Sequence, residues 1–295
     1  MPLVIAAADI GSNTAHLLVA EVTDGKLRRL VNESEWLSLG EVVSRTGEIP
    51  RKDVLRLLDS MDSFMRLAQA NNADQTYIFA TEAMRQAKNH DEVLQEIKRK
   101  TGLDVDIVTA RRETEFSLRA VAMDSPGPDP FLLVEMGGGS MQIALCKASR
   151  VLEGVSAPIG TGALLARTAL EQPPSPEQIV ELGRVIRDAL DPVDDMGAPR
   201  RVVAAGGVAR GIWRALHPDL DRVIAIQELE HLAWDTARLT SAQITARYGV
   251  KQKRAQTLLP GATAFAAVLR LVGQPDMTVS EFGVREGAIL EMAGA

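Results

Sequence analysis

The chain has 295 residues, of which 46 % are hydrophobic, so it is long enough for two domains of about 150 residues with substantial cores. Its net charge of -6 gives no global attraction to nucleic acid or to an anionic membrane. The single cysteine, Cys146, excludes an internal disulfide and a cysteine-based zinc site, and suits a reducing cytoplasm.

The first part of the chain alternates between predicted strands and helices. The apolar run "LVIAAA" stops at Asp9, which is too early for a signal peptide or a spanning helix, and it predicts a buried strand. After a turn and a second strand, "KLRRLVNESEWLSLG" predicts a third strand and a loop. Helical spacing of apolar residues predicts a helix over 51–71, and "QTYIFA" predicts a short buried strand.

The pattern continues with "HDEVLQEIKRKTG", a predicted helix closed by glycine, and "LDVDIVT", a predicted strand. "ARRETEFSLRAVAM" predicts a helix, with Thr109 as its candidate N-cap. "DSPGPDP" has the composition of a linker, and "FLLVEMGGGSMQIALC" then opens a second unit. "PPSPEQIVELGRVIRDAL" predicts a proline-started helix, "RVVAAGGVARGIWRAL" a strand, glycine turn and helix, and the chain from Gln227 onward is mostly helical. This alternation predicts an α/β fold.

An internal repeat links the two halves. "AADIGSNTAHLLVA" and "LVEMGGGSMQIALC" each place an acid at a strand end, then a glycine-led turn, a hydroxyl residue and an apolar strand. Bare amides at such turns suit anions, so two of them facing across a cleft would grip a phosphate from both sides, with a metal between the acids. The alternatives are an ordinary hairpin and an old duplication kept for folding alone.

Five motifs, in order along nearly the whole chain, carry a resemblance: "DIGSNTAHLLVAEV", "ATEAMRQAKN", "EMGGGS", "LLPGATAFAAVL" and "GVREGAILE". They are similar to motifs of the exopolyphosphatase and guanosine pentaphosphate phosphohydrolase family of the actin–hexokinase superfamily. The resemblance implies two ribonuclease-H-like (actin-like ATPase) α/β domains with an interdomain cleft. Residues 1–124 would form the first domain, with a C-terminal helix at about 281–295 packing back on it, and residues 125–280 the second.

The resemblance also implies site residues. Phosphate would be bound by Gly11, Ser12, Asn13, Thr14, Gly137, Gly138, Gly139 and Ser140. Asp9 and Glu135 would hold Mg²⁺ or another divalent cation, which takes oxygen ligands. Glu113 matches the glutamate that activates water in the family, and Arg85 matches an arginine that would neutralise phosphate charge. For Glu113 and Arg85 the alternatives are a solvated first-turn glutamate and a surface ion pair.

The chain departs from the family pattern at the centre of this predicted site. Glu135 stands where the family has aspartate, and Met141 and Gln142 replace a threonine and a glutamate. Arg112 replaces a glutamate beside Glu113, and its positive charge should lower the pKa of that neighbour. His16 is interpreted as a core histidine rather than a ligand. Basic residues that would line an exit path for a polyanion, or form solvated faces, are Arg111, Arg112, Lys251, Lys253 and Arg254.

The leading hypothesis is a cytoplasmic hydrolase that removes terminal phosphate from inorganic polyphosphate or the 5′-phosphate from guanosine pentaphosphate. We expect no nucleic-acid or membrane partner, and a homodimer is possible. The first alternative is a sensor that binds the same ligands without turnover, which an assay of phosphate release with Mg²⁺ would distinguish. A small-molecule kinase of the same superfamily is the second alternative, and ATP-dependent phosphorylation of an acceptor would support it.

Overall fold

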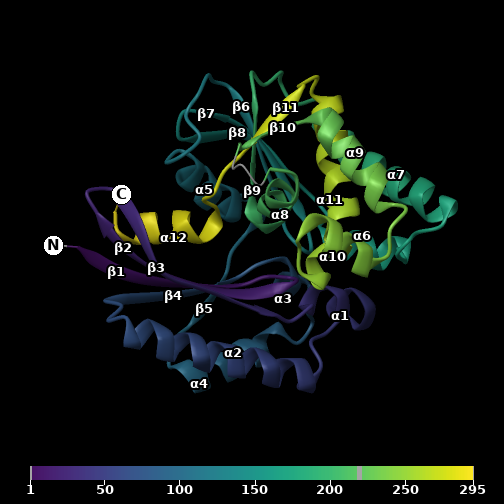
Figure 1. Cartoon of the computed structure of the whole chain (residues 1–295). Coiled ribbons are helices and arrows are strands. Elements are labelled where there is room, and N and C mark those ends of the chain that lie inside the picture. The colour runs from purple at the N-terminus through teal and green to yellow at the C-terminus, as the bar shows by residue number, and fades with distance from the viewer. Residues whose placement is uncertain (1, 218–220, 295) are drawn as a thin grey trace. The chain divides into compact units, whose positions relative to one another are not determined.

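A computed structural model describes residues 2–217 and 221–294 (Figure 1). The chain divides into two compact units: unit 1 comprises residues 1–120 and 283–295, and unit 2 comprises residues 121–282. The sequence placed these divisions at 124/125 and 280/281 instead. Asp124 lies with unit 2 because its carboxylate accepts hydrogen bonds from Arg222 (2.5 Å), Ser280 (2.7 Å) and the amide of Glu281 (2.8 Å).

Unit 1 is built on a five-stranded sheet of order β3-β2-β1-β4-β5. Its strands are β1 (Leu3–Ile10), β2 (Thr14–Thr23), β3 (Lys26–Trp36), β4 (Gln75–Ala80) and β5 (Val105–Ile107). The first three strands pair antiparallel, and β4 lies parallel to both β1 and β5. Helices α2 (Arg51–Ala70) and α4 (His90–Thr101) cover one face, and α12 (Val284–Met292) lies on the other (Figure 1).

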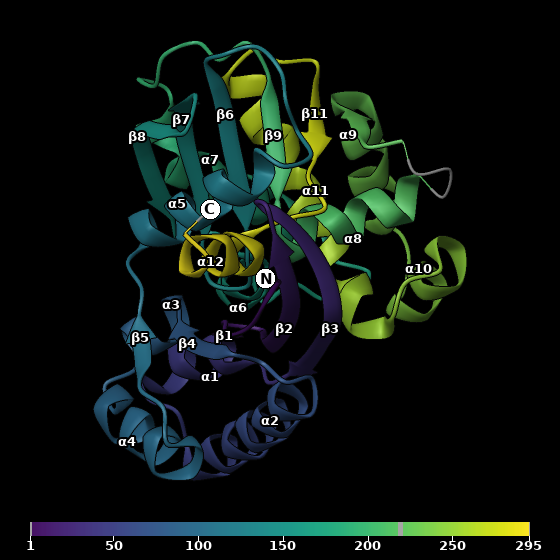
Figure 2. The same cartoon turned by 90° about the vertical axis from the view of Figure 1, so that its left-hand side faces the viewer.

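Unit 2 repeats this strand order with one strand added at the edge. Its sheet has the order β10-β11-β9-β6-β7-β8, and Figure 2 shows β8, β7, β6, β9 and β11 side by side. The strands are β6 (Phe131–Met136), β7 (Met141–Lys147), β8 (Arg150–Ala157), β9 (Val202–Ala205), β10 (Val223–Ala225) and β11 (Asp276–Val279). The helices are α6 (Thr161–Thr168), α7 (Pro176–Leu190), α8 (Gly206–Leu216), α9 (Ile226–Thr236), α10 (Ser241–Tyr248) and α11 (Gln252–Leu271). The predicted α/β class is confirmed.

Several local predictions are confirmed by the ends of the helices. Gly102 adopts the left-handed conformation (φ 76°) that closes α4, and Pro176 starts α7 behind a capping box formed by Ser175 and Gln178. Thr109 caps α5 (Ala110–Val121), because its hydroxyl accepts the amide N–H of Arg112 at 3.1 Å. The chain thus turns into α5 immediately after β5, which fixes the start of the helix that carries Glu113.

The sequence missed one helix that supports the first turn. The segment after the third strand was predicted as a loop, whereas α1 (Leu39–Thr46) begins there behind Ser38, whose φ is 57°. Short helix α3 (Glu82–Gln86) also follows β4 directly. Within residues 2–217 and 221–294, no helix is long and apolar enough to span a lipid bilayer.

Candidate active site

The first glycine-led turn joins β1 to β2 in unit 1. The amide of Gly11 donates to the carbonyl of Thr14 at 3.0 Å and closes the turn. The carbonyl of Ser12 accepts the amide of Gly40 at 2.7 Å, and that of Asn13 accepts the amide of Leu37 at 2.8 Å. The start of α1 therefore holds the carbonyls of the turn on one side.

The second turn joins β6 to β7 in unit 2 and has the same construction. The amide of Gly137 donates to the carbonyl of Ser140, again at 3.0 Å. The carbonyls of Gly138 and Gly139 accept the amides of Ala163 (3.0 Å) and Gly160 (3.2 Å) at the start of α6. The repeat in the sequence therefore corresponds to a repeat in backbone hydrogen bonding. Two hairpins that shared only an apolar pattern would not need to have the same hydrogen bonds.

Two glycines that sequence reasoning missed let these helices approach the turns. A Cβ atom on Gly40 would lie 2.6 Å from the Cβ of Ser12, and one on Gly160 would lie 2.5 Å from backbone atoms of Gly138 and Gly139. Both distances are far shorter than real contacts, so no other residue fits without displacing the turn. The signal was present in the sequence, because "LSLG" and "APIG" extend the internal repeat beyond the strands.

The carbonyls of each turn are engaged by the start of a helix, but some amides of the turns are not engaged. In the part of the chain that the structure describes, the amides of Ser12, Gly138 and Gly139 donate to no acceptor. Such amides form anion-binding concavities. The amides of Gly11 and Gly137 are already used to close the turns, so their predicted contribution to phosphate binding would rest on close approach of the backbone, and it stays a prediction.

Asp9 ends β1 beside the first turn. Its Oδ1 atom is buried and has no hydrogen-bond partner among the described residues. Burial raises the pKa of Asp9 to about 6, and the nearby positive charge of Arg285 acts in the opposite direction. Arg285 is itself 6 % exposed and donates to the side chain of Asn32 at 3.2 Å. A buried carboxylate oxygen without a hydrogen-bond partner is costly unless a ligand binds it.

The motif around Arg285 explains how α12 reaches this place. Glu286 pairs with Arg29 of β3 at 2.8 Å and accepts the amide of Gly283 at 3.0 Å, which caps α12. Gly287 lies so close to α5 that an added Cβ would stand 1.8 Å from the carbonyl oxygen of Phe116. The three consecutive residues "REG" thus supply a charge near Asp9, an anchor to the sheet and a close helix contact.

Glu135 occupies the matching strand end in unit 2. It is 6 % exposed, and its side chain lies against Gly206, where an added Cβ would be 3.2 Å from the Cγ of Glu135. Gly206 has φ 88°, so the turn from β9 into α8 favours glycine for its conformation as well. The side chain of Glu135 therefore lies against a glycine, whereas Asp9 has the positive charge of Arg285 nearby.

The predicted divalent cation would need oxygen ligands from the two strand-end acids. No group of three or more histidine, cysteine, aspartate or glutamate residues within the described ranges is arranged to hold a metal ion. Mg²⁺ commonly binds one or two carboxylates and completes its shell with waters and phosphate oxygens. The orphaned Oδ1 of Asp9 fits that kind of site. Asp9 and Glu135 as ligands stay a prediction.

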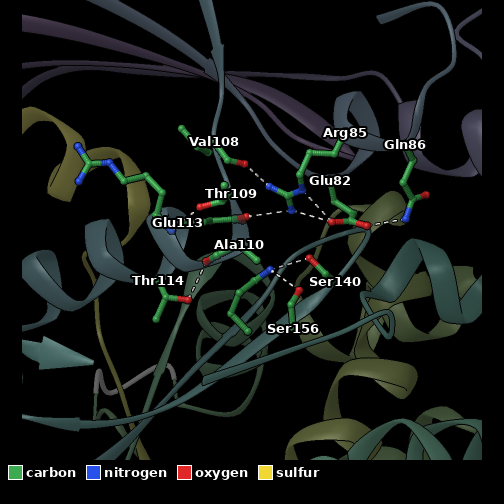
Figure 3. Close-up of polar contacts among 12 residues, drawn as sticks. Glu82, Arg85, Gln86, Val108, Thr109, Ala110, Glu113, Thr114, Ser140 and Ser156 are labelled. Carbon is green, nitrogen blue, oxygen red and sulfur yellow. Dashed lines mark hydrogen bonds and ion pairs between the residues drawn. The ribbon is translucent and has the colours of Figure 1, made fainter. Parts of the chain in front are cut away.

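Glu113 and Arg85 are brought together in unit 1, from α5 and α3 (Figure 3). The Nη2 atom of Arg85 lies 3.5 Å from the Oε2 atom of Glu113 in an ion pair, and the exposed fractions of the two side chains are 20 % for Arg85 and 13 % for Glu113. Arg85 also pairs with Glu82 at 2.6 Å and donates to the carbonyl of Val108. Glu82 is a residue that sequence reasoning missed, although its spacing of three from Arg85 on a short helix was a usable signal.

Arg112 does not direct its charge only at its neighbour in sequence. Its guanidinium binds Glu291 of α12 and Glu115, and it lies 4.6 Å from the centre of the Phe116 ring. The positive charge is therefore shared by two other carboxylates. The predicted effect of Arg112 on the pKa of Glu113 stays a prediction.

The other basic residues that were predicted to line a polyanion path or to form solvated faces lie in two kinds of environment. Arg111 pairs with Glu115 at 3.0 Å on the surface of unit 1. In unit 2, Lys251 and Lys253 are exposed, whereas Arg254 lies against Gly211 of α8. Desolvation, and then the positive charge of Arg214, lowers the pKa of Arg254. A role of these residues in binding a polyanion stays a prediction.

Comparison with known proteins decides the family. The model of the Ppx/GppA phosphatase family matches residues 18–295. The chain belongs to this family. Exopolyphosphatase 1 of Mycobacterium tuberculosis is 25 % identical over 299 residues, covering 96 % of this chain and 86 % of that protein. A crystal structure of the Aquifex aeolicus member of the Ppx/GppA family is similar with a TM-score of 0.85 and 26 % identity, covering 99 % of this chain and 98 % of that one.

The fold is also similar to that of a crystal structure of an exopolyphosphatase from Cytophaga hutchinsonii, with a TM-score of 0.91 and 23 % identity. The match covers 99 % of this chain and 98 % of that chain. The family and the fold predicted from the motifs are therefore confirmed. The first turn, at residues 11–14, lies before the residues that the Ppx/GppA family model matches. A phosphate-binding role of the first turn therefore stays a prediction, based on its likeness to the second turn, which lies within the matched residues.

Proposed function

We propose that this Ppx/GppA family member is a phosphohydrolase that releases terminal phosphate from inorganic polyphosphate, guanosine pentaphosphate or both. The observation that carries the proposal is the repeated turn. Twice, an acid at a strand end is followed by a turn whose carbonyls are hydrogen-bonded to the start of a helix, and the amides of Ser12 in the first turn and of Gly138 and Gly139 in the second are left as donors. Such donors stabilise the charge that phosphoryl transfer concentrates on phosphate oxygens.

In this proposal, Glu113 accepts a proton from the attacking water as its oxygen bonds to the terminal phosphorus. The bond from that phosphorus to the bridging oxygen breaks, and the shortened chain leaves with the electron pair. Arg85 holds the carboxylate of Glu113 through their ion pair at 3.5 Å and bears a positive charge toward the developing anion. Ser12, Thr14 and Ser140 supply hydroxyl donors to phosphate oxygens. When bound at Asp9 and Glu135, Mg²⁺ would neutralise phosphate charge.

A specific observation favours the second candidate, a sensor that binds without turnover. Gln142, where the family has glutamate, is 2 % exposed, and its amide donates to Ser140 at 2.7 Å. A neutral side chain engaged in this way accepts no proton. The sensor therefore keeps the ligand class of the hydrolase and differs from it only in turnover.

The test is phosphate release from short polyphosphate, long polyphosphate and guanosine pentaphosphate in parallel, with Mg²⁺ and with excess chelator. Mg²⁺-dependent release from at least one substrate is the expected result. Calorimetric binding of the same three compounds accompanies it. Binding without release from any of them would overturn the hydrolase in favour of the sensor, and neither binding nor release would overturn both. Phosphate transfer from ATP to an acceptor would favour the kinase.

A further inference from the structure

The repeat extends across three strands in each unit. In unit 1, the register places Asp9 of β1 opposite His16 of β2, and His16 opposite Ser34 of β3. Directly opposite residues of antiparallel strands share a face of the sheet. The row therefore consists of an acid, a nitrogen-bearing side chain and a serine.

Unit 2 has the same row. Glu135 of β6 lies opposite Gln142 of β7, and Gln142 lies opposite Ser156 of β8. In both rows the middle residue is also two positions after the hydroxyl residue that ends the turn. Imidazole and amide differ in shape, but both can present an N–H at their tip.

Each middle residue contacts the hydroxyl of its own turn. The Nε2 atom of His16 lies 2.6 Å from the Oγ1 of Thr14. The Nε2 atom of Gln142 donates to the Oγ of Ser140 at 2.7 Å, and it lies 3.4 Å from the Oγ of Ser156. The same contact thus occurs at both turns, made by different residue types, which indicates that the contact and not the side chain is what the two halves share.

The chemistry of a hydroxyl gives this contact a consequence. A serine or threonine hydroxyl has one hydrogen to donate and lone pairs to accept with. When a neighbouring N–H donates to the oxygen, the hydroxyl keeps its own hydrogen for another acceptor. If the neighbour accepts instead, the hydrogen is consumed and a lone pair faces any incoming anion.

We propose that His16 and Gln142 are matched positioning residues, each donating an N–H to the hydroxyl of its turn so that Thr14 and Ser140 direct their hydrogens at a bound phosphate oxygen. This inference rests on phosphate being the ligand of the turns, as in the proposed function. It requires His16 to carry hydrogen on Nε2. It replaces the interpretation of His16 as a core histidine and gives Gln142 a role of its own.

The test is binding of a short polyphosphate to the full chain by calorimetry, in a Glu113→Gln background that prevents turnover. His16→Leu and Gln142→Met, which remove the donor, should each weaken binding about tenfold. His16→Gln supplies the donor that unit 2 uses, and should bind within about threefold of the parent. Equal weakening by His16→Leu and His16→Gln, or none by His16→Leu, would overturn the proposal.

Two further measurements separate positioning from support of the fold. In a Thr14→Val background, His16→Leu should have no additional effect, because its contribution passes through the Thr14 hydroxyl. Additive losses would contradict this. Nitrogen-15 spectra, assigned among the four histidines by the His16→Gln variant, should show hydrogen on Nε2 of His16 at neutral pH. An unprotonated Nε2 would refute the role of His16.

Failure of the two proposals can be told apart. If the wild type binds polyphosphate with the predicted dependence on His16 and Gln142 but releases no phosphate, the hydrolase fails and the positioning role stands. If the wild type releases phosphate while His16→Leu and Gln142→Met bind as the parent does, the hydrolase stands and the positioning role is refuted. If the parent binds no polyphosphate, both are overturned.

Discussion

The two glycine-led turns share a backbone and differ in the charges around it. Both close with the same amide-to-carbonyl bond of 3.0 Å, and both rest on the start of a helix through a glycine. The first turn is in a unit that also contains Arg285, Glu113 and Arg85, whereas the second has Gln142 and Gly206 beside its acid. Backbone geometry is thus retained in both halves, while the groups predicted to move a proton, Glu113 with Arg85, lie in unit 1.

This difference shows how two structurally similar turns can contribute differently to binding and to catalysis. A turn that offers amides and hydroxyls binds an anion without any group that changes protonation. A turn near a buried carboxylate and an ion pair adds groups that hold a cation or move a proton. We therefore expect substitution of the ionisable residues Asp9 and Glu113 in unit 1 to affect turnover more than binding, and substitutions at the second turn to affect binding at least as much as turnover.

The largest effect is expected at the acid of the first turn. Asp9→Asn should abolish Mg²⁺-dependent phosphate release, because the variant loses the predicted ligand charge. The same variant should be more stable than the wild type in chelator at pH 8. The folded state raises the pKa of Asp9 from 3.8 to about 6, so it binds this proton more tightly than the unfolded chain does. That difference corresponds to a penalty of at most about 3 kcal/mol for the ionised form.

Because the pKa of Asp9 is higher in the folded state than in the unfolded chain, the free-energy penalty depends on pH. The penalty is absent below about pH 4, grows as the pH rises to about 6, and is constant above. Urea unfolding in chelator should therefore show a stabilisation by Asp9→Asn that is present at pH 8 and nearly lost at pH 4. Asp59→Asn, at an exposed position on α2, serves as the control and should show no such trend. A wild type more stable than Asp9→Asn at pH 8 would contradict the assignment.

The next effect is expected at the predicted base. Glu113→Gln keeps size and hydrogen bonding but accepts no proton, so phosphate release should fall by roughly 10² to 10⁴. Affinity for polyphosphate should hold or rise, because a negative charge is removed. Glu115→Gln is the matched control on the same helix, where Glu115 pairs with Arg111 at the surface. A single-turnover rate within about threefold of the wild type would remove Glu113 from the role of base.

Much of the backbone framework of this candidate site could be predicted from the sequence, because it depends on short-range order. Each acid with its turn, and the cap at Thr109, depends only on residues that are a few positions apart in the sequence. The contacts made by Arg285 and Gly287 could not be predicted in this way, because they depend on α12 returning to β1 and α5 from the far end of the chain. Glu82 was missed for a different reason. Its ion pair with Arg85 is local, at a spacing of three residues, but the short helix that brings the two side chains together was not predicted.

A third prediction compares the glycines that support the two turns. Gly40→Ala and Gly160→Ala would each force a Cβ within 2.6 Å of atoms of the adjoining turn. Each should cost about 1–3 kcal/mol of unfolding free energy and reduce phosphate release about 10- to 100-fold, because the donors are displaced. Gly183→Ala on α7, where a Cβ meets nothing within 4 Å, is the control and should be neutral or slightly stabilising. Should only one of the two turn variants lose activity, the turns would not be functional equivalents.

The smallest effect is expected at two helix caps, one in each unit. Thr109 accepts the amide of Arg112 at the start of α5, and Ser175 accepts the amide of Gln178 at the start of α7. Replacing either by alanine removes one capping bond and should cost about 1 kcal/mol of unfolding free energy. The costs should be similar because the bonds are chemically alike, and both helices should persist because their packed faces are unchanged.

The rate of phosphate release should distinguish the Thr109 and Ser175 variants, although their losses of unfolding free energy are similar. Only α5 carries Glu113, and the cap fixes the first turn of that helix, so a slight fraying there moves the carboxylate relative to Arg85. Thr109→Ala should therefore reduce phosphate release a few-fold at a temperature where the protein is fully folded, whereas Ser175→Ala should leave it unchanged. Thr109→Ser, which keeps the capping hydroxyl, should restore the rate. Equal rates for all three variants would show that the position of α5 is set by packing against α12 alone and that the cap contributes only stability.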